Sequence, residues 1–288
     1  MKSRISRKIY LFVAAFAVVG AWSAQAATIV FSDDFTDGTV SPWIDETDVT
    51  LSVADDTGGL GSGNALFGDT SVSVNRTLAR FDAVTLANAG DWIEVSLDFR
   101  FDGTLSVDRF TPAIGLYSTN GTSSDISNDQ GYAASVSSAA DSAGDPDTVY
   151  ENTLGREDET LNNDPDPTHG ILAGSDVSSL FEDNTDDVLQ SGENYDITFR
   201  ITRTASSEAF LEYTLNGALA EGGAQLSFSA TDTDASPFFG FDQFGLRNRN
   251  NDFAIDNVII TTNIPEPASL ALLGLGVTAL VGRRRRRR

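Results

Sequence analysis

The sequence contains no cysteine, a single histidine, and no lysine after residue 8. Without cysteine the chain has no disulfides, no thiol nucleophile, and no zinc–thiolate or iron–sulfur site. The one histidine, His169, lies in the acidic stretch DPDPTHGI. One imidazole cannot form a three-histidine metal site, and no G-x-S-x-G motif offers it a serine partner. The sequence therefore excludes thiol and multi-histidine metal chemistry and disfavours a serine triad.

Long apolar runs are also missing, except at the two ends of the chain. Four basic residues within positions 2–8 precede an apolar run over 9–22, and small residues follow at Ala24 and Ala26. This order is typical of a secretory signal peptide. We therefore predict a signal helix over residues 1–26, cut by signal peptidase before Ala27. The run is shorter than the roughly 20 residues that a spanning helix needs.

Positive charge is scarce between the two ends. Residues 27–264 hold 41 Asp and Glu against nine Arg and no Lys, a formal charge of −32. A body this acidic repels nucleic acid and anionic membrane surfaces, so neither is expected as a partner. Self-repulsion also lowers stability unless salt or bound cations screen it. The charge predicts a protein of saline water or of a cation-rich cell surface.

Alternating apolar and polar residues fill much of the body. The stretch WIEVSLDFRFDG at 92–103 places five apolar side chains on one face and polar ones on the other. Period-two alternation of this length predicts a strand with one buried face. The stretches YDITFRITR at 195–203 and FLEYTLNGALA at 210–220 repeat it, and Asn216-Gly217 predicts a tight hairpin turn. The residues expected to be buried are Ile93, Val95, Leu97, Phe99, Phe101, Tyr195, Ile197, Phe199, Ile201, Leu211, Tyr213 and Leu215.

No segment of the body has a sustained 3.6-residue apolar period. Only Ala83–Ala89 and Val177–Phe181 have the spacing of a single helical turn. Many short strands separated by turn residues predict an all-β, antiparallel two-sheet jelly-roll sandwich over residues 27–262. Within it, residues 141–194 are rich in acids, Gly, Pro and Asn, which predicts long loops with one or two strands.

Paired carboxylates are the enzymatic candidates. Glycoside hydrolysis needs two of them about 5–9 Å apart across the scissile bond. Glu94 and Asp98 share the polar face of the 92–102 strand, and Glu212 lies on a later strand. With so many acids in the chain such pairs arise by chance, so a hydrolase is the alternative rather than the favoured function.

Acid-rich turns favour calcium as a cofactor, because Ca²⁺ takes six to eight oxygen ligands. Asp33, Asp34 and Asp37 follow the first expected strand, and Asp256 lies beside Asn257 in the last one. First and last strands are often neighbours in jelly rolls, so these oxygens are expected to converge. A second candidate set of calcium ligands is Glu157, Asp158, Glu159, Asp164 and Asp166. Neither set matches the residue spacing of an EF-hand.

Aromatic side chains are the candidates for binding sugar rings. Trp43, Trp92, Tyr117, Tyr132 and Tyr150 are all available, although most aromatics of a sandwich belong to its core. Tyr132 and Tyr150 are flanked by polar loop sequence. We therefore predict these two as ligand-binding residues.

The C-terminus combines three features in order: Pro265-Glu266-Pro267, the apolar run 268–282, and six arginines at 283–288. Residues 263–288 thereby resemble the PEP-CTERM sorting signal of exported bacterial proteins. The resemblance implies a short transmembrane helix, transient anchoring in the inner membrane, and cleavage by an exosortase near Pro265, Glu266 and Pro267. By the positive-inside rule the arginines would remain in the cytoplasm and the body outside.

The body resembles concanavalin A-like and laminin-G-like sandwiches in three stretches: FSDDF at 31–35, TLNGAL at 214–219 and FAIDNVIITT at 253–262. The resemblance implies a fold and favours glycan or matrix binding. We therefore expect a secreted or cell-surface protein without enzymatic activity, which binds extracellular polysaccharide or builds the matrix. The alternatives are a secreted glycoside hydrolase or polysaccharide-active enzyme, and a permanently anchored structural protein.

Overall fold

The computed structural model describes residues 27–45, 50–61, 63–69, 75–103, 112–120, 129–136, 152–158, 177–183, 189–219, 222–248 and 251–264. The predicted signal helix, the predicted transmembrane helix over 268–282 and the Pro-Glu-Pro motif lie outside them. The chain divides into a unit of residues 1–28 with 263–288, and a second unit, Ile29–Thr262. The fold below is that of the second unit. In the described ranges no helix is long and apolar enough to cross a membrane.

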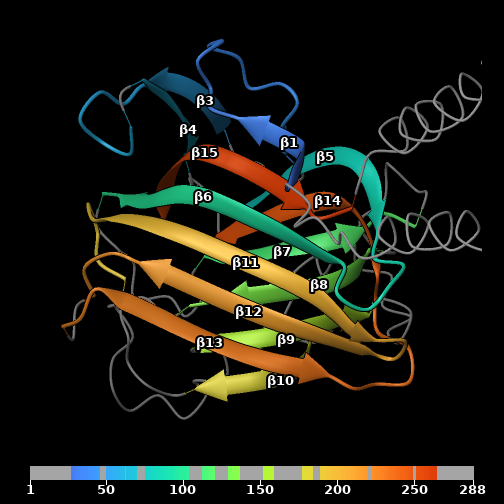
Figure 1. The fold of residues 1–288 in the computed structure, drawn as a ribbon. Coiled ribbons are helices and arrows are strands. Elements are labelled where there is room, and N and C mark those ends of the chain that lie inside the picture. Colours follow the sequence, from blue (N-terminus) through green and yellow to red (C-terminus); the bar gives the residue numbers. More distant parts are fainter. Residues whose placement is uncertain are drawn as a thin grey trace, which may run out of the picture. The chain divides into compact units, whose positions relative to one another are not determined.

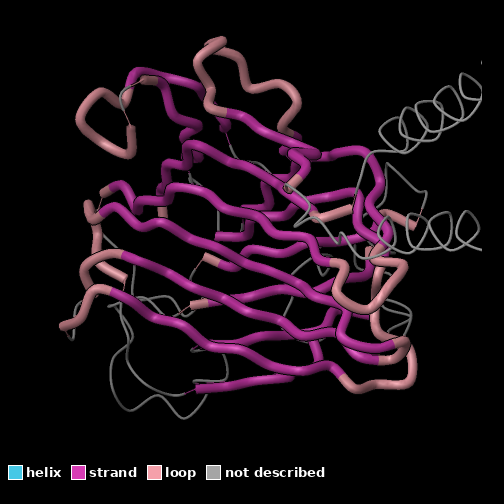
Figure 2. The backbone as a smooth tube through the Cα atoms, in the orientation of Figure 1, coloured by secondary structure: helices cyan, strands magenta, loops and turns pink. Residues whose placement is uncertain are grey.

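Strands, turns and loops make up the described part of the second unit (Figure 2). The strands are β1 (Thr28–Asp33), β2 (Ile44–Asp45), β3 (Thr50–Asp55), β4 (Asn64–Asp69), β5 (Asn75–Thr85), β6 (Trp92–Asp102), β7 (Ala113–Ser118), β8 (Gln130–Ser135), β9 (Asn152–Asp158), β10 (Val177–Asp183), β11 (Asn194–Ala205), β12 (Glu208–Asn216), β13 (Gln225–Asp232), β14 (Gly240–Asn248) and β15 (Asp252–Thr262).

The strands form two sheets that lie face to face (Figure 1). Sheet A has the order β13-β12-β11-β6-β15-β4-β3, with β1 also paired to β15, and sheet B has the order β10-β9-β8-β7-β14-β5-β2. The pairs along both orders are antiparallel. This confirms the predicted all-β two-sheet sandwich. The pairing of β1 with β15 also confirms that the first and last strands are neighbours.

The alternation in sheet A sets its inner face. Ile93, Val95, Leu97, Phe99 and Phe101 of β6 are at most 2% exposed, and the side chains between them are half-buried. The alternating residues expected to be buried on β11 and β12 are buried as well. Each such side chain contributes roughly 1.5–3 kcal/mol by leaving water, so sheet A supplies much of the stability of the sandwich.

Two local predictions were wrong. Residues 83–85 end strand β5, and Val177–Phe181 begins β10, which pairs with β9 around a bulge. Cross-strand pairing therefore overrode the weak helical spacing of both segments. Among the described residues of the loop-rich region 141–194, β9 and β10 are strands, and β11 begins at its last residue.

The prediction of a tight two-residue turn at Asn216-Gly217 was also wrong. β12 ends at Asn216, but β13 begins only at Gln225, so residues 217–224 form a longer connection. Gly217 has a φ of 154°, and a Cβ there would lie 2.8 Å from the carbonyl oxygen of Asn194. Close packing against β11, rather than a two-residue hairpin, thus requires glycine at this position.

A buried polar cluster joins the two sheets at one edge. Tyr132 of β8 is fully buried, and its hydroxyl donates to Asp232 of β13 at 2.7 Å while accepting from the Phe238 amide at 3.0 Å. Arg156 of β9 lies 3.6 Å from Asp232 and 2.8 Å from Asp234. Tyr132 is therefore a structural link between the sheets, with its hydroxyl hydrogen-bonded on both sides within the protein, and its role in ligand binding stays a prediction. Tyr150 lies outside the described residues.

Candidate functional site

The aspartates predicted to bind calcium after β1 accept hydrogen bonds in local turns. Asp33 accepts from the Phe35 amide at 2.9 Å and from Trp43 Nε1 at 2.8 Å. Asp34 and Asp37 each accept from the backbone amide and the hydroxyl of the threonine two residues later. Burial, together with the charges of Asp37 and Asp34, raises the pKa of Asp33 despite its two hydrogen bonds. The three carboxylates thus hydrogen-bond within the turn after β1, and their binding of calcium stays a prediction.

Asp256, the fourth predicted calcium ligand, belongs to a row of carboxylates on the outer face of sheet A. Asp98 of β6 pairs with Asp196 of β11 on one side and with Asp256 of β15 on the other. Burial and the neighbouring charge of Asp196 raise the pKa of Asp98, although the Asn257 side chain donates to it at 2.7 Å. Burial also raises the pKa of Asp256, with a further contribution from the charges of Asp98, Asp34 and Asp56. Among the described side chains, no three acids or histidines are grouped as a metal site, and calcium stays a prediction.

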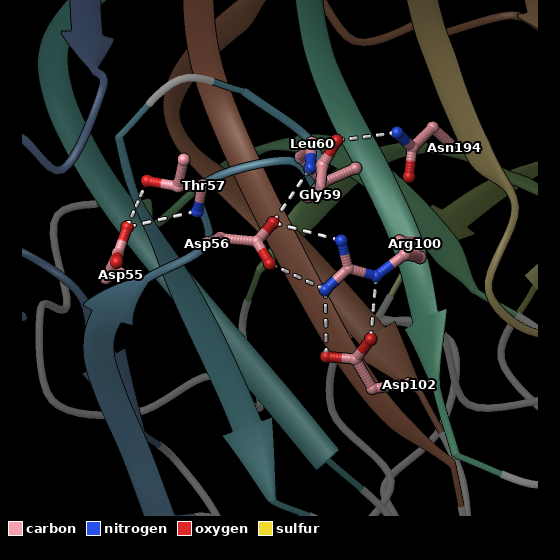
Figure 3. A network of polar contacts seen from close by, with 8 residues as sticks. All are labelled: Asp55, Asp56, Thr57, Gly59, Leu60, Arg100, Asp102 and Asn194. Carbon is pink, nitrogen blue, oxygen red and sulfur yellow. Dashed lines mark hydrogen bonds and ion pairs between the residues drawn. The ribbon is translucent and has the colours of Figure 1, made fainter.

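An arginine network fastens the β3–β4 loop onto the same face (Figure 3). Arg100 of β6 donates to both oxygens of Asp56, at 2.9 and 3.0 Å, and to Asp102 at 2.7 Å. The Asn194 side chain donates to the carbonyl of Gly59 at 2.8 Å. Although burial opposes it, the bonds from Arg100 lower the pKa of Asp56. Both ends of the guanidinium are thus engaged within the protein, which is the arrangement of a structural clamp.

The predicted hydrolase residues do not form a facing pair. Glu94 accepts from Arg200 at 2.7 Å, and the Arg200 guanidinium stacks on the Trp92 ring, 4.5 Å from its centre. Glu212 pairs with Arg200 across β12 and β11, and its side chain is exposed. Glu94 is therefore held by an ion pair, and Asp98 has an aspartate beside it.

The outer face of sheet B carries polar side chains beside glycine and alanine. The inner face of sheet B is identified by Phe244, which packs against Trp43, and by Tyr132, which bonds to sheet A. The alternate positions point away from sheet A and align in rows across the strands. The first row runs Arg80, Gln243, Tyr117, Gly131, Glu157, and the next runs Leu78, Gly245, Gly115, Ala133, Gly155.

Tyr117 lies flat on the glycines of these rows. A Cβ at Gly131 would lie 2.7 Å from Tyr117 Cδ1, and a Cβ at Gly115 would lie 2.5 Å from Tyr117 Cε2. Glycine within a strand weakens it and often marks close approach of a ring, a backbone or a ligand. The ring packs with Leu78, Ala113 and Ala133 in a small apolar cluster. The glycines therefore allow one aromatic ring to lie against the sheet.

Polar groups surround this ring. Gln243 donates to Asp129 at 2.6 Å and accepts from Arg80 at 3.2 Å. Burial raises the pKa of Tyr117 well above its usual value, and the charges of Glu157 and Asp129 add to this while Arg247 opposes them. Tyr117 therefore keeps its proton and is a hydrogen-bond donor. Tyr117, Gln243 and Glu157 are fully buried, whereas Arg80 and Arg247 are half-buried.

Two residues of this polar row were predicted from the sequence to have other roles. Tyr117 was one of the candidate aromatics, and Glu157 belonged to the second calcium set. Gln243 and Arg80 carried no signal, because their strands are more than 160 residues apart in the chain. Only the strand register brings these side chains into one row.

Residues 263–287 match the model of the PEP-CTERM protein-sorting motif. The chain ends in a PEP-CTERM motif. Such a motif indicates an exported, cell-surface protein that an exosortase sorts. The PEP-CTERM motif covers only the tail, so it says nothing about the sandwich. No curated protein matches the chain.

Solved structures similar to this chain include lectins and two carbohydrate-active enzymes. The PL-14 alginate lyase from Aplysia kurodai has a TM-score of 0.50 at 12% identity, with 81% of this chain and 98% of that one covered. Lectin II from Ulex europaeus has a TM-score of 0.47 at 12% identity, over 83% and 100% of the two chains. The carbohydrate esterase vb_24B_21 from the Shiga toxin-encoding bacteriophage phi24B has a TM-score of 0.44, again at 12% identity, over 83% and 100%. At this identity the likeness establishes a concanavalin A-like fold alone.

Proposed function

We propose that this exported protein binds extracellular polysaccharide through the outer face of sheet B and does not catalyse a reaction on it. The observation that carries the proposal is the polar row Arg80, Gln243, Tyr117 and Glu157 beside a strip of glycine and alanine. A layer that served stability alone would be as well built from apolar side chains, because buried polar groups lose their hydration.

The row suits a ligand rich in hydroxyl groups. Tyr117 and the two arginines donate hydrogen bonds, Glu157 and Asp129 accept them, and Gln243 does both. Strands lie about 4.8 Å apart, so the row from β5 to β9 extends over roughly 19 Å. This length fits an extended chain better than a compact molecule. Arg80, which is half-buried, lies at the β5 end of the row, whereas Gln243, Tyr117 and Glu157 are fully buried.

Binding is a better fit than catalysis. Because its pKa is raised, Tyr117 cannot act as a base near neutral pH. The one observation that favours a hydrolase is the raised pKa of Asp98 next to Asp196, since hydrolysis uses one protonated and one ionised carboxyl group. Asp98 and Asp196 are direct cross-strand partners on one sheet face, and the Asn257 side chain donates to Asp98 at 2.7 Å, so neither observation requires a catalytic role.

A glycan array probed with the full-length chain in mild detergent tests the binding proposal. Tyr117→Phe should weaken polysaccharide binding about tenfold, the value of one hydrogen bond in a buried site. Tyr213→Phe is the matched control, because Tyr213 lies in the core of sheet A. Equal binding by Tyr117→Phe and the wild-type protein would rule out this face as the site.

Assays for new reducing or unsaturated ends, run on the glycans that bind, test the absence of catalysis. We expect none from the wild-type protein. Product release that disappears in Asp98→Asn would instead establish the hydrolase. A protein that binds no glycan and releases no product would have a structural role in the matrix.

A further inference from the structure

We propose that β13 is an interaction surface, and that its partner is the β13 of a second copy of this chain. β13 ends the order of sheet A, and among the described residues β12 is the only strand that pairs with it (Figure 1). An edge strand presents a row of unpaired amide and carbonyl groups, which another strand can bind. Such pairing concerns assembly and does not depend on whether the protein binds glycan.

The other strands that end a sheet order carry features that hinder pairing. β2 has two residues, and β10 contains a bulge between Ser179 and Phe181 and ends in Glu182-Asp183. β3 has six residues, and the last of them is the exposed Asp55. Short strands, bulges and charged side chains are the means by which proteins protect an exposed edge.

β13 differs from these three strands. Its eight residues keep an unbroken register with β12, and Gln225–Thr231 contains no charged side chain in a body whose formal charge is −32. The one acid of the strand, Asp232, is 1% exposed and accepts from the Tyr132 hydroxyl at 2.7 Å. Two of these acidic chains can therefore pair along β13 without placing carboxylates opposite one another, which would destabilise the pair.

The sequence of β13 is suited to pairing with itself. Ser227-Phe228-Ser229 reads the same in both directions, so a two-fold axis at Phe228 sets Ser227 of one copy opposite Ser229 of the other. The same register sets Gln225 opposite Thr231 and leaves Asp232 beyond the paired stretch. Ser227, Ser229 and Thr231 are exposed, so their hydroxyls are available for cross-strand hydrogen bonds.

Phe228 holds the strand in place from the inner face. Its ring stacks on Tyr213 of β12 and on Phe181 of β10, with ring centres 4.9 and 5.3 Å apart. Phe228 nevertheless stays half-buried, and the Phe228 of the second copy would cover part of what is exposed. Because these contacts order the edge before any partner arrives, pairing costs less conformational entropy than it would for a loose strand.

The net charge sets a condition on this dimer. Two bodies of −32 repel each other within a Debye length, which is about 10 Å at 0.1 M salt and about 3 Å at 1 M. We therefore expect the dissociation constant of the dimer to fall by about tenfold or more between these two salt concentrations. Sedimentation of the full-length chain in mild detergent measures it, and a monomer at both concentrations would overturn the proposal.

Cysteine cross-linking tests the register, because the chain has no cysteine of its own. In the proposed pair, the Cα atoms of Ser227 and of Ser229 in the second copy lie about 5 Å apart, whereas two Ser227 residues lie about 7–8 Å apart. A disulfide needs less than about 7 Å. An equimolar mixture of Ser227→Cys and Ser229→Cys chains, oxidised with glutathione disulfide at 1 M salt, should therefore give about tenfold more covalent dimer than either variant alone. Both serines are exposed, so the substitutions leave the core intact.

A mixture of Ser227→Cys with Glu212→Cys is the matched control. Glu212 is exposed and lies opposite Ser229 in the same row, one strand further from the edge. It would lie about 10 Å from Ser227 of the second copy, beyond the reach of a disulfide, so little covalent dimer is expected. Equal cross-linking in the two mixtures, or a dimer in which Ser227→Cys and Ser229→Cys do not cross-link, would overturn β13 as the contact.

Discussion

The cluster that joins the two sheets makes a quantitative prediction, because two aspartates contact the same arginine in opposite environments. Asp232 and Asp234 lie 3.6 and 2.8 Å from Arg156, but their side chains are 1% and 65% exposed. Asp232 also accepts from Tyr132 at 2.7 Å and from the Asp234 amide at 2.8 Å. Distance alone would assign the stronger effect to Asp234, whereas burial assigns it to Asp232.

Asp232→Ala should destabilise the protein by about 3–5 kcal/mol, because it removes the buried carboxylate that both Arg156 and the Tyr132 hydroxyl contact. Tyr132→Phe, which removes one bond to a charged group, should cost about 1.5–3 kcal/mol. Asp234→Ala should cost at most about 1 kcal/mol, as for other exposed ion pairs.

Urea unfolding of the full-length chain in detergent, with the slope of the transition compared between variants, measures these differences. A midpoint shift without a change of slope identifies an effect on stability itself. Equal losses in Asp232→Ala and Asp234→Ala would refute the view that burial, rather than the ion-pair distance, decides the strength of this link.

Three further predictions concern the carboxylate row, calcium and the tail. Because the folded-state pKa of Asp98 is raised, its charged form lowers stability above that pKa, and the penalty vanishes below the unfolded value of about 3.9. Asp98→Asn should therefore raise Tm at pH 7 by about 1–3 °C and leave it unchanged near pH 3, and a lower Tm at pH 7 would contradict this. If the predicted calcium site forms, millimolar Ca²⁺ should raise Tm relative to EDTA in the wild-type protein but not in Asp34→Asn or Asp256→Asn, and identical melting curves would remove calcium from the account. Mass spectrometry of the protein from its surface should find a C-terminus near Pro265, whereas a mature chain still ending at Arg288 would indicate a permanent anchor.

The strands of sheet A and their buried sides could be predicted from the sequence because one face of each strand is in contact with solvent. In β6, the alternation of Ile93, Val95 and Leu97 with Glu94 and Ser96 predicts both the strand and the side that is buried. The first and last strands were likewise expected to be neighbours, from the logic of the jelly roll. These features depend on local pattern and on connection rules, both of which a single sequence contains.

Sheet B could not be predicted as far, because its central strands are buried on both faces. In AIGLYS of β7 and QGYAAS of β8, apolar and small residues occupy both sets of alternate positions. The alternation of residue types therefore does not indicate whether Tyr117 or Tyr132 faces the core. Tyr132 faces the other sheet and Tyr117 faces away, the reverse of the choice that polar flanking residues favoured. The site residues come from five strands that only long-range register brings together.

Alanine methyl groups offer the most direct test that the outer face of sheet B is the binding surface. Ala113 and Ala133 lie on that face, Ala79 and Ala134 lie on the inner face of the same sheet, and Ala209 lies in the core side of sheet A. On titration of the full-length chain with an oligosaccharide that it binds, we expect saturable shifts of the Ala113 and Ala133 methyl resonances, with little change at the other three. Shifts confined to Ala209, or no shift at Ala113 and Ala133 at saturation, would contradict it.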